Sequence, residues 1–114
     1  MAHPKPVAVS LVRLEGRLDS ETRDETRQRV TEASAASCRN VLVDLRSVTM
    51  IDSEGLAVLL AAQHRLETEG RRLLLVNHND QVERFLRRLG VRELFALFPT
   101  PQAALDSLPG GPES

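Results

Sequence analysis

Two short and almost uninterrupted apolar runs constrain the fold of this chain most strongly. Residues 40–45 read NVLVDL and residues 72–77 read RLLLVN. A strand that is apolar at successive positions has to be covered on both faces, which is typical of the central strands of a parallel sheet. Neighbouring parallel strands need a crossover connection, which is usually a helix. The two runs therefore predict an α/β fold.

The segment between the two runs has the pattern of such a crossover helix. Apolar residues recur on one helical face over residues 53–69, and Gly70 then ends the pattern. Asp52 precedes the first turn and is placed to cap it by accepting hydrogen bonds from backbone N–H groups. The sequence therefore predicts a capped helix that packs against the sheet.

The rest of the chain continues this alternation. Residues 7–14 predict a strand, and a helix with a thin apolar face follows to about residue 36. A short strand is expected at 93–98, followed by a last helix that Thr100 caps and Pro101 begins. With the helix described next, we expect one α/β domain with a mixed, mostly parallel sheet of four to five strands and about four helices.

A strongly amphipathic helix is expected after residue 78, with Asn79 or Asp80 placed as its cap. Its apolar residues recur at helical spacing, as in the core-facing stripe of a surface helix. The stripe contains Val82, Phe85, Leu86 and Leu89, whereas Arg84, Arg87 and Arg88 are expected on the solvated face.

The boundaries of the domain are also expected from composition. Gly16 should end the strand at 7–14. Residues 1–6 contain two prolines and are expected to be flexible or to form a short edge strand. Residues 109–114 are expected to be a disordered tail. The single domain would then span residues 7–108.

The composition excludes several classes of function. The formal net charge is −1 and the chain has no Trp or Tyr, so we expect neither an electrostatic nor a stacking surface for nucleic acid. Cys38 is the only cysteine, which excludes an intrachain disulfide and a cysteine-based zinc site. We find no signal peptide and no run approaching the roughly 20 apolar residues of a membrane span. We therefore expect a cytoplasmic protein that does not insert into a membrane.

The polar residues at the start of the helix predicted at 53–69 are the main candidates for a functional site. Ser53 follows the capping Asp52, so its hydroxyl would lie near unpaired N–H groups at the positive end of the helix dipole. Gly55 removes side-chain bulk and would let another backbone or a flat partner come close. The position also follows a central parallel strand, where open α/β sheets usually bind ligands. A capped helix start explains the spacing most simply, and a phosphorylation or partner site at Ser53 stays open.

An enzyme is less well supported by the residues. Ser53 is not in a nucleophile-elbow motif, and the one histidine that would share its sheet edge is His78. Asp19, Asp44 and Asp52 all fall near strand ends and would have to converge to hold a cation. Their positions are explained more simply if two of them cap helices and one is an acid at a strand end. No phosphate-binding loop or dinucleotide fingerprint occurs. We expect no catalytic residue, metal or cofactor.

Three segments, in this order along the chain, carry a family resemblance. They read VRLEGRLDSET, VLVDLRSVTMIDSEGLAVLL and LLLVNHNDQVERFLRRLGVRELFALFPTPQAAL. The first resembles the upstream Gly-x-Leu-Asp segment of STAS domains, the second their central Asp-Ser motif, and the third their closing strand–helix–strand–helix region. The STAS fold is the fold of bacterial anti-sigma factor antagonists. The resemblance covers roughly residues 7–108 and implies a mixed sheet with helices.

This resemblance implies a function that spacing does not show. Family members bind an anti-sigma factor that is itself a serine kinase, and so release its sigma factor. The kinase phosphorylates the serine after the motif's Asp and ends the complex, and a separate phosphatase restores it. The matching serine is Ser53, and Asp19 would lie near the same surface. We expect the partner-binding surface to contain Asp19, Met50, Asp52, Ser53, Glu54, Gly55 and Leu56.

One position departs from the family pattern, because Glu54 stands where the family has a second serine. A phosphate on Ser53 would carry about −1.5 to −2 charges and would be repelled by Asp52 and Glu54, although the helix N-terminus would offset part of this. STAS domains also occur as accessory subunits of lipid transport systems and of stress-signalling assemblies. A STAS binding subunit without phosphorylation is therefore the alternative.

Overall fold

The computed structural model describes residues 9–35 and 40–109. The expected N-terminal segment 1–6, Cys38 and nearly all of the tail at 109–114 lie outside these residues. None of the described helices is long and apolar enough to cross a bilayer. The elements in chain order are β1 (Val9–Leu18), α1 (Arg23–Ala35), β2 (Asn40–Ile51), α2 (Ser53–Thr68), β3 (Leu73–Val76), α3 (Asp80–Arg88), the 3-10 helix η1 (Arg92–Leu94), β4 (Ala96–Phe98) and α4 (Pro101–Asp106).

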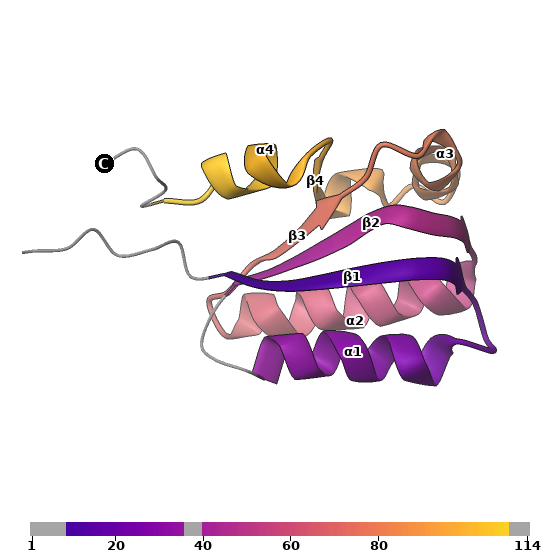
Figure 1. Ribbon diagram of the computed structural model, residues 1–114, viewed down its shortest axis with the longest axis horizontal. Helices are drawn as coiled ribbons and strands as arrows, with labels where there is room; N and C mark the ends of the chain where they lie inside the picture. Colours follow the sequence, from indigo (N-terminus) through magenta and orange to yellow (C-terminus); the bar gives the residue numbers. More distant parts are fainter. Residues whose placement is uncertain (1–8, 36–39, 110–114) are drawn as a thin grey trace, which may run out of the picture.

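The strands form one sheet in the order β1-β2-β3-β4 (Figure 1). All three neighbouring pairs in the described residues are parallel. Helices α1 and α2 lie side by side against one face, and α4 lies on the other side of the sheet (Figure 1). The predicted α/β class is confirmed; a mixed, mostly parallel sheet of four to five strands was expected, and the four described strands are all parallel.

The core explains why the two central strands are apolar at nearly every position. A main cluster lies between the sheet and the helices α1, α2 and α3, and it takes Val41 and Val43 from β2. A smaller cluster takes Leu42 from the opposite face of β2 and packs it with Ala104 of α4 and with Leu108, which follows that helix. Because both faces of β2 and β3 are covered, alternating polar residues would be buried there without partners.

Two strands are longer than the sequence predicted. The prediction that Gly16 ends the first strand is wrong, because β1 continues to Leu18 and its partner β2 continues to Ile51. The pairing between them shifts register twice around Gly16, whose φ is +73°. Bulges of this kind absorb an extra residue and let a strand pair continue through a left-handed backbone position. Because of this longer pairing, the carboxyl ends of β1 and β2 lie side by side.

The helix starts follow short-range capping signals. The side chain of Asn79 accepts a hydrogen bond from the N–H of Gln81 at 2.8 Å, and Thr100 accepts one from the N–H of Ala103 at 3.1 Å. The predicted cap Thr100 is confirmed, and of the two candidates for α3 the cap is Asn79, with Asp80 as the first residue of the helix. α1 begins at Arg23, directly after Thr22.

Candidate functional site

The start of α2 lies at the carboxyl end of β2. Asp52 is its N-cap: Oδ1 accepts hydrogen bonds from the backbone N–H of Glu54 at 2.9 Å and of Gly55 at 3.2 Å. Ser53 is the first residue of the helix and is exposed. The predicted cap is confirmed, and it leaves Ser53 on the surface beside the N-terminal end of α2.

The end of β1 holds this helix start in place. Leu18 pairs with Ile51 across the sheet, and the N–H of Asp52 donates to the carbonyl oxygen of Leu18 at 3.1 Å. Gly55 is buried, and a β-carbon added there would lie 2.7 Å from the β-carbon of Leu18. The backbone that comes close to Gly55 is therefore that of β1 in the same chain. The missing side chain serves the packing of the domain itself.

Asp19 follows Leu18, so the strand pairing places it beside Asp52 at the sheet edge. Its side chain is buried: Nε of Arg17 donates to Oδ2 at 2.8 Å, and the N–H of Glu21 donates to Oδ1 at 3.0 Å. The hydrogen bond from Arg17 lowers the pKa of the Asp19 carboxyl, although burial acts in the opposite direction. The carboxylate of Asp19 is thus used within the turn, and the mostly exposed Arg17 carries the charge that a partner would meet.

Glu54 is held by α1. Nη1 of Arg23 donates to Oε1 of Glu54 at 3.1 Å. This hydrogen bond, together with the charges of Asp24 and Glu54, raises the pKa of Arg23. Much of the negative charge of Glu54 is therefore balanced inside the domain. A phosphate on Ser53 would meet less repulsion than the sequence alone suggests.

The two apolar residues expected at the partner surface differ in exposure. Leu56 is 4% exposed and belongs to the main core. Met50 is half-buried and lines a groove of about 370 Å³ between the end of β2 and α3. The groove is also lined by Ile51, Gln81, Val82, Arg84, Phe85 and Arg88. No sequence pattern indicates this groove, because β2 and α3 meet only in the tertiary structure.

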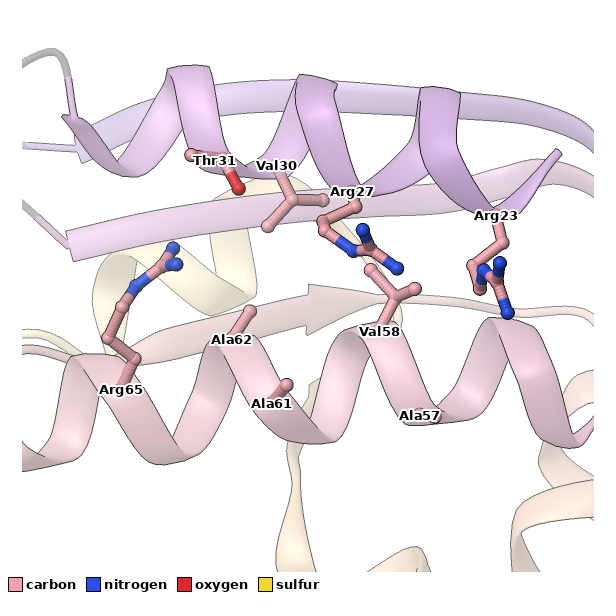
Figure 2. Close-up of a pocket in the computed structure, with 9 residues that line it drawn as sticks. All are labelled: Arg23, Arg27, Val30, Thr31, Ala57, Val58, Ala61, Ala62 and Arg65. Carbon is pink, nitrogen blue, oxygen red and sulfur yellow. The ribbon is translucent and has the colours of Figure 1, made fainter.

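A second hollow, of about 190 Å³, lies between α1 and α2 (Figure 2). Its apolar wall consists of Val30, Ala57, Val58, Ala61 and Ala62. Figure 2 shows the side chains of Arg23, Arg27 and Arg65 reaching into the space between the helices. All three have partners in the domain: Glu54 for Arg23, Asp24 for Arg27 at 3.6 Å, and Ser34 for Arg65 at 2.7 Å. Carboxylates therefore balance Arg23 and Arg27, whereas Arg65 has a hydrogen-bond partner that carries no charge.

The described residues do not form the serine–histidine pair or the cation site that were considered as enzyme alternatives. His78 is exposed, and within the described residues no hydrogen bond joins it to Ser53. Asp44 is occupied by Arg46, whose Nε and Nη2 donate to it at 3.0 and 2.8 Å. Across residues 9–35 and 40–109, no three His, Cys, Asp or Glu side chains gather in a way that would hold a metal ion.

The chain is similar to a known domain family and to several proteins of known name. The family model described as "STAS domain" matches residues 2–104. An anti-sigma F factor antagonist of Paenibacillus polymyxa is 29% identical over 101 residues, which are 88% of this chain and 86% of that protein. The crystal structure of an anti-sigma factor antagonist from Mycobacterium paratuberculosis superposes with a TM-score of 0.77 at 28% identity, covering 87% of this chain and 84% of that one.

The anti-sigma factor antagonist SpoIIAA is similar in fold. Its unphosphorylated form gives a TM-score of 0.71 at 21% identity, covering 88% of this chain and 87% of that one. The phosphorylated form of SpoIIAA from Bacillus gives a TM-score of 0.63 at 20% identity, covering 88% and 90%. The same architecture has therefore been solved both with and without phosphate in a relative.

Proposed function

Because this chain belongs to the STAS domain family, we propose that it acts as an anti-sigma factor antagonist. It binds an anti-sigma factor and so releases the sigma factor that this protein holds. The names of its relatives from Paenibacillus polymyxa and Mycobacterium paratuberculosis support this proposal. The protein acts by binding and performs no catalysis of its own.

The observation that carries the regulatory part of the proposal is the position of Ser53. It is exposed at the first residue of α2, directly after the capping Asp52. We assign Ser53 as the phosphoacceptor of the anti-sigma factor, which is a serine kinase. A phosphatase that acts on phospho-Ser53 restores binding. The two solved forms of SpoIIAA support a switch of this kind.

The geometry favours a switch that leaves the fold intact. A phosphate at a helix N-terminus lies near unpaired N–H groups and the positive end of the dipole. The ion pair between Arg23 and Glu54 reduces the repulsion from the neighbouring carboxylate. Phosphorylation therefore acts at the interface, through charge repulsion and the cost of desolvating the phosphate.

The partner surface is formed by the exposed and half-exposed residues around Ser53, namely Met50, Asp52 and Glu54. The other three expected residues lie beneath them. Asp19, Gly55 and Leu56 are buried, so they support the shape of this surface rather than supplying much of its area.

The direct test is a binding and kinase assay with the anti-sigma factor encoded nearest to this protein's gene. The unmodified protein should bind, and ATP should both label Ser53 and dissociate the complex. Ser53→Ala should bind equally, remain unlabelled and stay bound in ATP. If the kinase labels Ser53→Ala as strongly as the unmodified protein, Ser53 is not the acceptor.

The alternative is a STAS binding subunit of a lipid transport system or stress-signalling assembly that works without phosphate. Glu54, in place of the family's second serine, is the observation that favours it. In that case the same surface docks onto a permease or scaffold protein. A stable complex with such a protein, together with no phosphate transfer from any kinase partner, would replace the leading proposal.

A further inference from the structure

The groove between β2 and α3 has features that the domain itself does not use. Its wall contains the half-buried side chains of Met50 and Phe85. Arg84 and Arg88 lie one turn apart on α3 and line the same groove. No acidic residue lines it. The groove therefore combines an apolar wall with two positive charges on one side.

The two arginines of the groove differ from the paired arginine on the same helix. Arg87, on the same helix, is paired with Glu83 at 2.9 Å. Arg84 and Arg88 are exposed, and within the described residues neither forms an ion pair or a side-chain hydrogen bond. An exposed guanidinium that forms no ion pair within its own domain can pair with a carboxylate of another molecule, and its planar fork suits that group.

The groove includes the end of β2, which leads directly into the helix start that carries Ser53. Met50 and Ile51 line it, Asp52 caps α2, and Ser53 follows directly. A partner that covers Ser53 and extends over the end of β2 would therefore reach the groove. Within an interface, charge complementarity of this kind selects the partner and raises the association rate.

We infer that this groove receives an acidic segment of the anti-sigma factor, which places one apolar side chain beside Met50 and Phe85 and its carboxylates on Arg84 and Arg88. This inference rests on the proposed function and extends its interface from α2 to α3. It also revises the expectation that these two arginines only form a solvated face.

The test is the affinity of the unphosphorylated protein for its anti-sigma factor, measured at several salt concentrations. The double variant Arg84→Glu/Arg88→Glu should bind at least about tenfold more weakly and show a smaller salt dependence. Arg84→Gln/Arg88→Gln should lose less, and Arg84→Lys/Arg88→Lys should retain most of the affinity. Thermal unfolding of each variant checks that the fold persists.

The matched control is Arg29→Glu/Arg72→Glu, which makes the same change in net charge at two exposed positions on α1 and before β3. It should bind within about threefold of the unmodified protein. Equal losses in both double variants would reduce the effect to overall charge and overturn the inference. So would an unchanged affinity and salt dependence of Arg84→Glu/Arg88→Glu.

Two further outcomes identify other occupants. If the unmodified protein self-associates in sedimentation and Arg84→Glu/Arg88→Glu abolishes this without affecting anti-sigma binding, the groove holds a second copy and the inference is wrong. If the unmodified protein binds no anti-sigma factor, the proposed function fails and the inference fails with it. A failure limited to the α3 variants leaves the proposed function standing.

Discussion

Leu18 and Gly55 are packed so closely that no side chain fits between them. A β-carbon on Gly55 would lie 2.7 Å from the β-carbon of Leu18 and closer still to its carbonyl oxygen. The same carbonyl oxygen accepts the N–H of Asp52 at 3.1 Å. The end of β1 thus fixes the position and orientation of the first turn of α2. Ser53 lies in this turn.

Gly55→Ala should therefore destabilise the domain, by about 1–3 kcal/mol in urea unfolding, because a rigid backbone contact has to move. The direction is informative, since alanine at an unhindered helix position is favoured over glycine by about 1 kcal/mol. The control is Ala57→Gly at an exposed position of the same helix, which should lose about 1 kcal/mol. A Gly55→Ala protein more stable than the unmodified one would contradict the packing against Leu18.

Asp52→Ala should lower the free energy of unfolding by about 0.5–2 kcal/mol, because two backbone N–H groups at the start of α2 lose their acceptor. Asp52→Asn keeps an acceptor oxygen and should retain most of the stability. Denaturant unfolding of both variants measures the difference. Equal losses in the two variants would mean that the Asp52 side chain does not act as a cap.

The ion pair between Arg23 and Glu54 should affect phosphorylation of Ser53. Arg23→Gln leaves the Glu54 charge unbalanced and should slow labelling by the kinase roughly twofold to fivefold, the size expected for an exposed ion pair. In a Glu54→Gln background the same change should have little effect, because the two residues act as a pair. If Arg23→Gln slows labelling equally in both backgrounds, Arg23 contacts the kinase or the phosphate directly.

Acid should destabilise the protein through Asp44, among other buried carboxylates. The hydrogen bonds from Arg46 hold the pKa of Asp44 below its usual value of 3.8, although burial acts against them. Its contribution to stability is therefore present above about pH 4 and is lost as the pH falls through the lower folded-state pKa. Unfolding measured from pH 6 down to about pH 2 should show a shallower acid decline in Asp44→Asn than in the unmodified protein.

The control for this pH dependence is Glu67→Gln, which removes an exposed carboxylate from α2. It should change the acid decline less than Asp44→Asn does. A larger effect of Glu67→Gln would show that surface charge, rather than the pair of Asp44 and Arg46, controls acid stability.

Phosphorylated protein should unfold at nearly the same temperature as the unmodified form, within about 2 °C, while its affinity for the anti-sigma factor falls. The reason is that a phosphate on Ser53 lies at a helix N-terminus, where negative charge is favourable. Kinase-treated Ser53→Ala is the matched control for both measurements. A large drop in melting temperature on phosphorylation would show that the switch works by unfolding.

Residues close together in the chain were enough to predict much of this protein. The two apolar runs identified β2 and β3, and the caps Asp52, Asn79 and Thr100 lie where the sequence placed them. Caps and strand–helix alternation depend on hydrogen bonds and periodicity within a few residues, so the sequence by itself determined them. It also determined that Ser53 begins a helix directly after a central strand.

Only the tertiary structure decided how that helix start is surrounded. The pairing of β1 with β2 runs past Gly16 and brings Leu18 against Gly55. Arg23 reaches Glu54 across 31 positions of sequence, and β2 places Met50 beside α3. These contacts depend on strand register and helix packing, whose energies are spread over the whole sheet and core. No short stretch of sequence contains these contacts. Local patterns therefore identified Ser53, but they did not identify the arginine that balances the charge of Glu54 or the groove next to α3.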